Sequence, residues 1–184
     1  MRRAPGERVG NIRLPAMDGT TFDSDSLQGR RFMLSFFRFA ACPFCNLRVH
    51  ELVKRFDELG NRFSVIAIFD SSPENLRRYA ERHAAPFPIL ADEQNVHYRA
   101  FGIERSVVGV LRGMVMRMPA VLHAMFVKGY LPTAINGHLT TMPADFLVDE
   151  TGVIRTAYYG RDEGDHLPFD RVRAFALGTQ TWEK

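Results

Sequence analysis

The sequence predicts an α/β fold in which a central mixed β-sheet is flanked by helices. Two observations carry this prediction. Residues 31–69 contain an apolar run, an amphipathic stretch and a second apolar run, and such a strand–helix–strand unit makes a parallel pair of strands. Two strand patterns over residues 145–159 are separated by a short turn and must therefore pair antiparallel. The two kinds of pairing together require a mixed sheet.

The first half of the chain supplies the parallel part of this sheet. Residues 9–29 are typical of a loop or a hairpin, with Asp18-Gly19 as a turn. Residues 31–39 are almost continuously apolar, as expected of a strand that is buried on both faces. From Cys45 the apolar residues follow helical spacing until Gly60, and residues 63–69 form the next buried strand.

The second half begins with a helix that has Ser72 as its N-cap and Pro73 at its first position. Residues 86–90 form a short strand at best, and residues 92–101 form a short helix that ends at Gly102. A long insert separates this helix from the hairpin. The last helix covers residues 168–177.

Length and composition bound the class of protein. The 184 residues are enough for one domain over residues 1–184 with its own core. The hydrophobic share of 46% excludes a disordered protein, and only two cysteines exclude a secreted disulfide scaffold. A net charge of +3 is too diffuse to indicate nucleic-acid binding. Because no apolar stretch follows Arg2 and Arg3, or reaches about 18 residues elsewhere, we expect a cytoplasmic protein.

The two cysteines, Cys42 and Cys45, lie where the first buried strand meets the helix that follows it. A thiol at a helix N-terminus faces unpaired N–H groups and the positive end of the helix dipole, and both stabilise the reactive thiolate. Pro43 fits the first helical position. We therefore expect Cys42 to be the outer, attacking sulfur with a lowered pKa. Cys45, on the inner face of the helix, is expected to be the shielded, resolving sulfur.

A zinc site is the alternative use of such a cysteine pair. Zinc usually requires four ligands, but the chain has no second cysteine pair and no histidines at ligand spacing. We therefore expect no metal and no other cofactor, and interpret the pair as a dithiol that cycles through a disulfide.

Several stretches of the chain together resemble one known family. They are residues 9–15, Asp18-Gly19, residues 26–30, the strand before Cys42 with the cysteine pair itself, residues 63–102 and residues 142–152. This combination is similar to the alkyl hydroperoxide reductase/thiol-specific antioxidant (AhpC/TSA) family, the peroxiredoxin-like branch of the thioredoxin fold. The resemblance covers about residues 9–102 and 141–177. It implies a thioredoxin-like fold with a helical insert over residues 103–141, before the last hairpin.

The resemblance also implies which residues contact the substrate. The cysteine pair matches the thioredoxin-type motif, so Pro43 and Phe44 between the cysteines belong to the substrate site. Pro143 matches the cis-proline that faces the disulfide in thioredoxin-type proteins, so Met142 and Pro143 are expected beside Cys42, with a cis bond between them. An ordinary proline at a strand start is the alternative.

The chain departs from the family at positions that hold the peroxide in peroxidatic members. Those members carry a threonine or serine three residues before the attacking cysteine and a proline four residues before that, where this chain has Phe39 and Ser35. The proline–aromatic dipeptide between the cysteines is instead similar to glutaredoxin-type sites. Phe36 also occupies the position of the buried acid of thioredoxins. We therefore expect thiol–disulfide exchange, with a peroxide rate not much above that of a free thiolate.

Two other functions remain open. In a peroxide reductase, Cys42 would be oxidised to a sulfenic acid with which Cys45 condenses. In a redox-sensing interaction module, the state of the pair would control what the insert binds. Either enzyme needs a thiol reductant such as thioredoxin, glutaredoxin or glutathione. Arg38, the charge inside the apolar run, either reaches water from the strand end or supports the Cys42 thiolate.

The insert has a composition of its own. From Arg105 to Ala144 it contains four basic residues and no acidic one, and apolar side chains fill most of the remaining positions. Helical pieces that break at Pro119 and Pro132 are expected. We expect residues 105–130 to be buried, as a cap on the domain or as a homodimer face, with the end of the insert beside the active site. A pliable peptide groove and a contact with anionic lipid are the alternatives.

Overall fold

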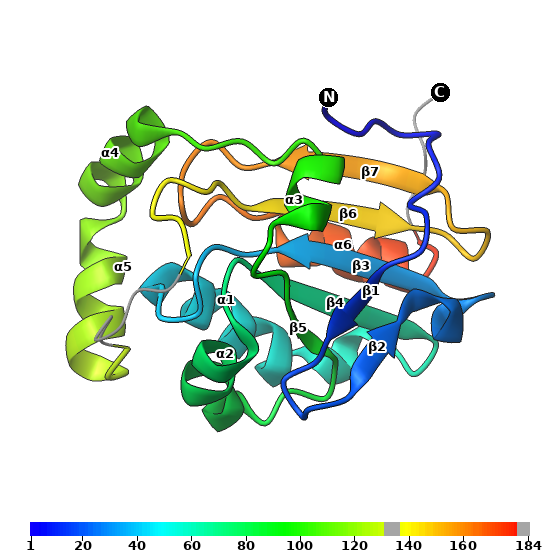
Figure 1. Ribbon diagram of the computed structural model, residues 1–184, viewed down its shortest axis with the longest axis horizontal. Helices are drawn as coiled ribbons and strands as arrows, with labels where there is room; N and C mark the ends of the chain where they lie inside the picture. Colours follow the sequence, from blue (N-terminus) through cyan, green and yellow to red (C-terminus); the bar gives the residue numbers. More distant parts are fainter. Residues whose placement is uncertain (131–136, 180–184) are drawn as a thin grey trace.

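A five-stranded mixed sheet forms the centre of the computed structural model, which describes residues 1–130 and 137–179 (Figure 1). The strand order is β5-β4-β3-β6-β7. β3 runs parallel to β4 and antiparallel to β6, so the predicted mixed sheet is confirmed. The strands are β3 (Arg31–Phe36), β4 (Phe63–Phe69), β5 (Ile89–Ala91), β6 (Ala144–Val148) and β7 (Ile154–Tyr159).

Helices cover both faces of the sheet because β3 is apolar on both sides. Met33 packs in the cluster formed with α1 (Pro43–Lys54), α2 (Pro73–Ala80) and α6 (Phe169–Ala176). Leu34 points to the opposite cluster, formed with α3 (Val96–Ala100) and the N-terminal hairpin of β1 (Arg13–Pro15) and β2 (Thr21–Asp23). In Figure 1, α3 lies in front of the sheet and α6 behind it.

The helix starts follow the sequence closely. The Ser72 side chain accepts a hydrogen bond from the Asn75 N–H and caps α2, with Pro73 in the first turn. The expected helix over residues 92–101 is shorter than predicted, because residues before α3 form its cap. The Asp92 carboxylate accepts the N–H groups of Val96 and of the two residues after it. Short 3-10 turns complete the domain at Ser24–Leu27, Phe56–Leu59 and Glu81–His83.

The insert forms α4 (Val107–Met116), α5 (Met118–Leu122) and a π-helical turn (His123–Val127) at one end of the molecule (Figure 1). Pro119 lies in the first turn of α5, and the chain bends by 77° between the two helical pieces, so the break at Pro119 is confirmed. Pro132, the other expected break, lies outside the described residues. Within the described ranges no single helix is long and apolar enough to cross a membrane. The bent pair over 107–127 passes that test only by combined length and composition.

The expectation that residues 105–130 are buried is wrong for the single chain. α4 contacts the rest of the molecule through two glycines. A Cβ added at Gly113 would overlap the Glu163 carboxylate, and one added at Gly109 would lie 2.6 Å from the Met142 sulfur. Because the buried positions of α4 are these two glycines, most of its large apolar residues point outward, and Val108 and Val115 are 76% and 77% exposed.

Candidate active site

Cys42 and Cys45 lie at the start of α1, just beyond the C-terminal end of β3 (Figure 1). Cys42 is the N-cap residue and Pro43 the first residue of the helix, as the sequence predicts. Both cysteines are free thiols, and both are 0% exposed. The expectation that Cys42 is the outer sulfur is therefore wrong, because Arg38 and the chain segment at Leu139 close over it.

Arg38 is buried against both cysteines. Its Nη1 lies 3.5 Å from the Cys42 sulfur, and its backbone N–H donates to the Cys45 sulfur at 3.4 Å. Its Nη2 donates to the Leu139 carbonyl. Of the two expectations for Arg38, reaching water is wrong, since the residue is only 4% exposed. The Arg38 backbone carbonyl accepts the Asp70 N–H, so the residue still lies beside the end of β4 and inside the sheet rather than at its surface.

The two thiols have opposite pKa shifts. Burial acts to raise the pKa of Cys42, but the hydrogen bond from Cys45, the charge of Arg38 and the N–H groups of Cys45 and Phe44 lower it to about 6. These N–H groups act on the sulfur electrostatically, although Cys42 makes no hydrogen bond that caps the helix. Burial and the neighbouring Cys42 hold the pKa of Cys45 well above its usual range. The opposite shifts favour Cys42 over Cys45 as the thiolate at neutral pH.

Glu163 is a site residue that sequence reasoning missed. Its carboxylate Oε1 lies 3.8 Å from Arg38 Nη1, and both side chains are buried. Burial raises the pKa of Glu163 even though Arg38 lies beside it. Within the described residues, Arg38 Nε and Glu163 Oε2 have no hydrogen-bond partner. Nothing in the local sequence around Glu163 indicates this position, because Arg38 and Glu163 are brought together only by the sheet and the insert.

Asp70, at the end of β4, holds down the segment where the insert returns to the sheet. Its Oδ2 accepts the backbone N–H of His138 and the hydroxyl of Thr141, each at 3.0 Å. Its Oδ1 accepts from the Asn95 amide at 2.7 Å. The same segment supplies Leu139, which contacts Arg38, so Asp70 fixes one wall of the cysteine site. These partners lie too far apart in the sequence for local patterns to indicate them.

Met142 and Pro143 connect this segment to β6. The expected cis bond between them is wrong, because no cis peptide occurs in the described residues. The Met142 N–H donates to the Glu104 carbonyl and the Pro143 carbonyl accepts from the Gly160 N–H. A trans bond, the lower-energy form, satisfies both contacts as the chain enters the strand. Met142 is buried beneath Gly109 of α4.

Phe44 lines a cavity of about 450 Å³ between α1, α5 and the chain before α6. Arg48, Arg117 and His166 line the same cavity. This cavity adjoins the cysteine helix.

A buried acid does lie on the cysteine side of the sheet, although Phe36 occupies the thioredoxin position. Asp145 lies two residues before Leu147 in β6, so both side chains point to the same face of the sheet. Leu147 packs in the same cluster as the cysteines. Asp145 accepts a 2.5 Å hydrogen bond from Ser35 and lies 3.1 Å from His166 Nδ1. Burial acts to raise its pKa, but His166 beside it keeps the pKa below the ordinary value. The Ser35 hydroxyl therefore belongs to the buried cluster of Asp145 and His166.

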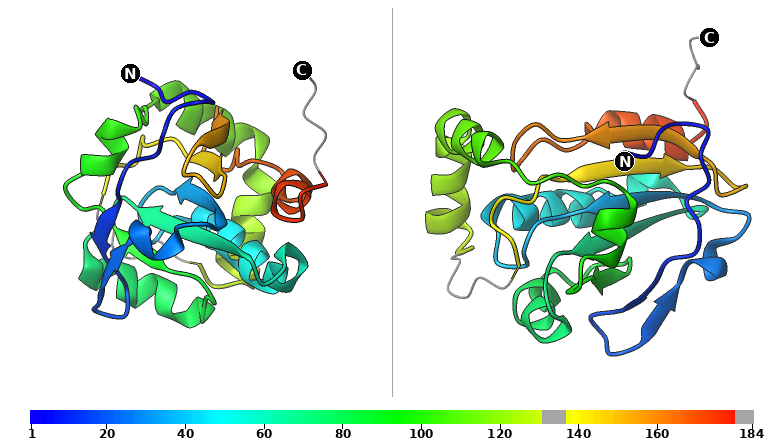
Figure 2. Two further views of the ribbon diagram at one scale, coloured as in Figure 1. Left: turned by 90° about the vertical axis from the view of Figure 1, so that its right-hand side faces the viewer. Right: turned by 45° about the horizontal axis from the view of Figure 1, so that its top comes forward.

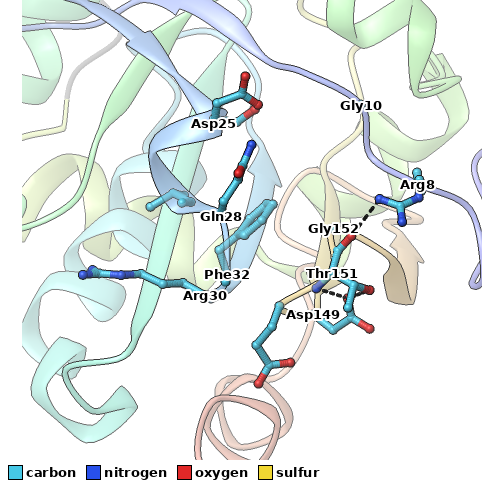
Figure 3. A pocket seen from close by; sticks show the side chains of 13 residues that line it. Arg8, Gly10, Asp25, Gln28, Arg30, Phe32, Asp149, Thr151 and Gly152 are labelled. Carbon is cyan, nitrogen blue, oxygen red and sulfur yellow. Dashed lines mark hydrogen bonds between the residues drawn. The ribbon is translucent and has the colours of Figure 1, made fainter.

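Another hollow, of about 510 Å³, lies at the other end of the sheet (Figure 3). Arg8 reaches the turn between β6 and β7 there and donates to the Thr151 carbonyl. Phe32, which lines this hollow, stands near the start of β3, whereas Cys42 follows the end of that strand. The hollow is therefore remote from the cysteine chemistry.

The chain is similar to known proteins in both sequence and structure. The sequence pattern of the AhpC/TSA family matches residues 5–157. Peroxiredoxin Bcp of Escherichia coli K12 is 31% identical over 107 residues, which is 56% of this chain and 69% of that protein. Peroxidoxin BcpB from Mycobacterium tuberculosis has a similar structure, with a TM-score of 0.67, 17% identity and coverage of 96% of this chain and 98% of that one.

A putative thiol:disulfide interchange protein DsbE from Chlorobium tepidum is also similar in structure. Its TM-score is 0.60, at 15% identity, with 95% of this chain and 96% of that chain covered. At such identities the structural likeness establishes the thioredoxin-like fold alone, because one fold supports several chemistries.

Proposed function

The chain belongs to the AhpC/TSA family of oxidoreductases, and from this premise we propose that it is a peroxiredoxin-like thiol peroxidase with Cys42 as the attacking residue. Peroxiredoxin Bcp of Escherichia coli, at 31% identity, supports peroxide reduction more than thiol–disulfide exchange, the first expectation from the sequence. The observation that carries the proposal is the Cys42 thiolate, whose pKa is lowered to about 6 by the hydrogen bond from Cys45 and by the charge of Arg38 beside it.

The first chemical step transfers two electrons from sulfur to the peroxide. The Cys42 thiolate attacks one peroxide oxygen, the O–O bond breaks, and the other oxygen leaves as an alcohol or water after taking up a proton. Cys42 then carries a sulfenic acid. Attack requires the thiolate, and a pKa of about 6 makes this form predominant at neutral pH.

Arg38 supplies donors where the family threonine is replaced by Phe39. One guanidinium nitrogen contacts the Cys42 sulfur, and Nε remains without a partner in the described residues. A guanidinium beside the reacting sulfur stabilises the negative charge that develops on the leaving oxygen, as a preorganised donor does in other enzymes.

Cys45 completes the cycle. Its sulfur attacks the Cys42 sulfenic acid, water leaves, and a Cys42–Cys45 disulfide forms. A thiol reductant such as thioredoxin, glutaredoxin or glutathione then attacks this disulfide and forms a mixed disulfide. A second thiol of the reductant releases the protein, so that both cysteines are thiols again and the reductant leaves as a disulfide. The neutral thiol favoured by the raised pKa of Cys45 keeps it from competing for the peroxide.

Thiol–disulfide exchange is the second candidate, favoured by one observation. Phe39 leaves the peroxide without the hydroxyl that peroxidatic members use, whereas an attack of Cys42 on a disulfide needs no such donor. In this reaction Cys42 forms a mixed disulfide with the substrate, and Cys45 releases the reduced product.

Stopped-flow reaction of the reduced protein with hydrogen peroxide, an alkyl hydroperoxide and a model disulfide separates the two candidates. We expect a hydroperoxide rate constant at least about a hundredfold above that of a free thiolate of equal pKa, reflecting roughly 3 kcal/mol of transition-state stabilisation. A free-thiolate rate with peroxide, together with rapid disulfide reduction, would establish exchange instead.

Two matched serine variants check the roles of the cysteines. Cys45→Ser should consume one equivalent of peroxide and yield a sulfenic acid that dimedone traps at residue 42. Cys42→Ser should not consume peroxide at a comparable rate. Equal reactivity of the two variants would contradict the assignment.

A further inference from the structure

The outer side of the insert carries a large apolar surface, here called the outer face. Val108, Val115 and Phe126 are each more than three quarters exposed. Other exposed apolar residues of α4, α5 and the π-helical turn surround them, namely Val107, Leu111, Met114, Met116, Met118, Leu122 and Val127. A soluble monomer rarely exposes so many large apolar residues close together in one segment, so this face is expected to contact something.

The charges around the outer face have one sign. Arg105, Arg112 and Lys128 are exposed and make no ion pair within the described part of the chain. Arg117 is neutralised by Asp162 at 2.7 Å, outside the insert. No acidic residue occurs between Arg105 and Ala144. The segment that carries the outer face is therefore apolar and positive, with no carboxylate of its own.

The bend between the helices decides how this surface can meet a bilayer. α4 has 10 residues, which corresponds to about 15 Å of helix, half the hydrocarbon thickness of a membrane. A bend of 77° separates it from the next helical piece, so the two cannot continue as one spanning rod. Figure 2 shows α4 and α5 at one end of the molecule. Their exposed apolar residues suit the interface between headgroups and acyl chains.

We propose that the outer face docks the protein on the surface of an anionic lipid bilayer, with the apolar side chains among the acyl chains and Arg105, Arg112 and Lys128 at the headgroups. Charge complementarity favours lipid over a second copy of this chain. Two-fold pairing would place the same patch on both sides of the interface. The cations of each copy would then face a partner surface that has no carboxylate in this segment.

Vesicle flotation of the full chain tests the proposal. The probes are vesicles of phosphatidylcholine alone and vesicles with about 30% phosphatidylglycerol. We expect binding to the anionic vesicles only, weakened by salt. The double variant Arg112→Gln/Lys128→Gln should bind roughly 25-fold more weakly, since each basic residue near an anionic surface contributes about fivefold. The triple variant Val108→Ser/Val115→Ser/Phe126→Ser should lose binding.

Matched controls carry the same kinds of change away from the insert. Val96→Ser/Leu177→Ser replaces residues that are 48% and 54% exposed, and Arg62→Gln/Arg171→Gln removes two other exposed cations. Both should bind like the parent chain, and circular dichroism establishes that every variant is folded. Equal binding to neutral vesicles overturns the proposal. A second overturning result is a parent chain that binds no vesicles but forms a concentration-dependent dimer in analytical ultracentrifugation, which the triple variant abolishes. A third is a parent chain that neither binds vesicles nor dimerises.

Discussion

Replacing Arg38 with glutamine should raise the pKa of Cys42 and slow its reactions at neutral pH. Arg38 Nη1 lies 3.5 Å from the Cys42 sulfur. At an effective dielectric constant of about 20, opposite charges about 4 Å apart attract by about 4 kcal/mol, which corresponds to roughly 3 pKa units. Glu163, 3.8 Å from the same nitrogen, offsets part of this attraction. We therefore expect a rise of about 2 units in the Cys42 pKa.

The pH dependence of iodoacetamide alkylation, with each cysteine followed by peptide mass spectrometry, measures this change. The thiolate is the reacting form and lies above the pKa, so raising the pKa moves the profile to higher pH. At pH 7 the thiolate fraction should fall from about nine tenths to about one tenth, and the alkylation rate should fall about tenfold. Near pH 10 the variant and the parent should react equally with iodoacetamide. The peroxide rate should stay low at that pH, because Arg38 also stabilises the leaving oxygen.

Arg48→Gln is the matched control. Arg48 is also buried, but its guanidinium contacts Glu51 and the Leu167 carbonyl. This variant should lose stability without any change in the pKa of Cys42. An unchanged alkylation profile in Arg38→Gln, or an equal shift in Arg48→Gln, would refute the reasoning.

Three further changes test other contacts. Asp70→Asn replaces one of the two accepting carboxylate oxygens with an NH2 donor, so the returning segment or Asn95 loses a contact. Labelling of Cys42 by N-ethylmaleimide should rise several-fold, with a stability loss of about 1–3 kcal/mol, and unchanged labelling would argue against this wall. Gly113→Ala places a Cβ against Glu163 and should lower the free energy of unfolding by about 1–3 kcal/mol, whereas Val115→Ala on the exposed side should change it by less than about 0.5 kcal/mol. Burial, and then neighbouring positive charge, lowers the pKa of His83 to about 4, so the unfolded chain takes up a proton first as the pH falls. Stability should therefore fall by about 2 kcal/mol between pH 6.5 and 4, and His83→Gln should flatten this dependence in urea unfolding.

The corrections to the site all concern contacts between distant parts of the chain. The first expectation of disulfide exchange rested on Phe39 and Ser35, which stand at the family's threonine and proline positions and are local features of the sequence. The structure brings Arg38, four residues before Cys42, against the attacking sulfur and pairs it with Glu163. The sequence left Arg38 open between water and Cys42 and gave no sign of Glu163, because the direction of the Arg38 side chain depends on how the insert closes over the end of β3.

The insert illustrates a second limit. Its apolar composition was interpreted as a sign of burial, because composition does not tell which side of a helix faces the protein. Gly109 and Gly113, four residues apart, form the contact side of α4, and the larger residues point outward. Small residues allow two backbones or a backbone and a buried carboxylate to approach closely, and this preference appears only when the partner surface is present.

The sequence by itself determined the features that depend on neighbouring residues. The apolar run of β3, the position of Cys42 and Pro43 at the start of α1, and the Ser72 cap of α2 follow from periodicity and helix-end chemistry, which act within a few residues. Only the tertiary structure decided the burial of Cys42 and the trans bond before Pro143. Those features depend on contacts between segments far apart in the chain, whose geometry the sheet topology sets after the local elements have formed.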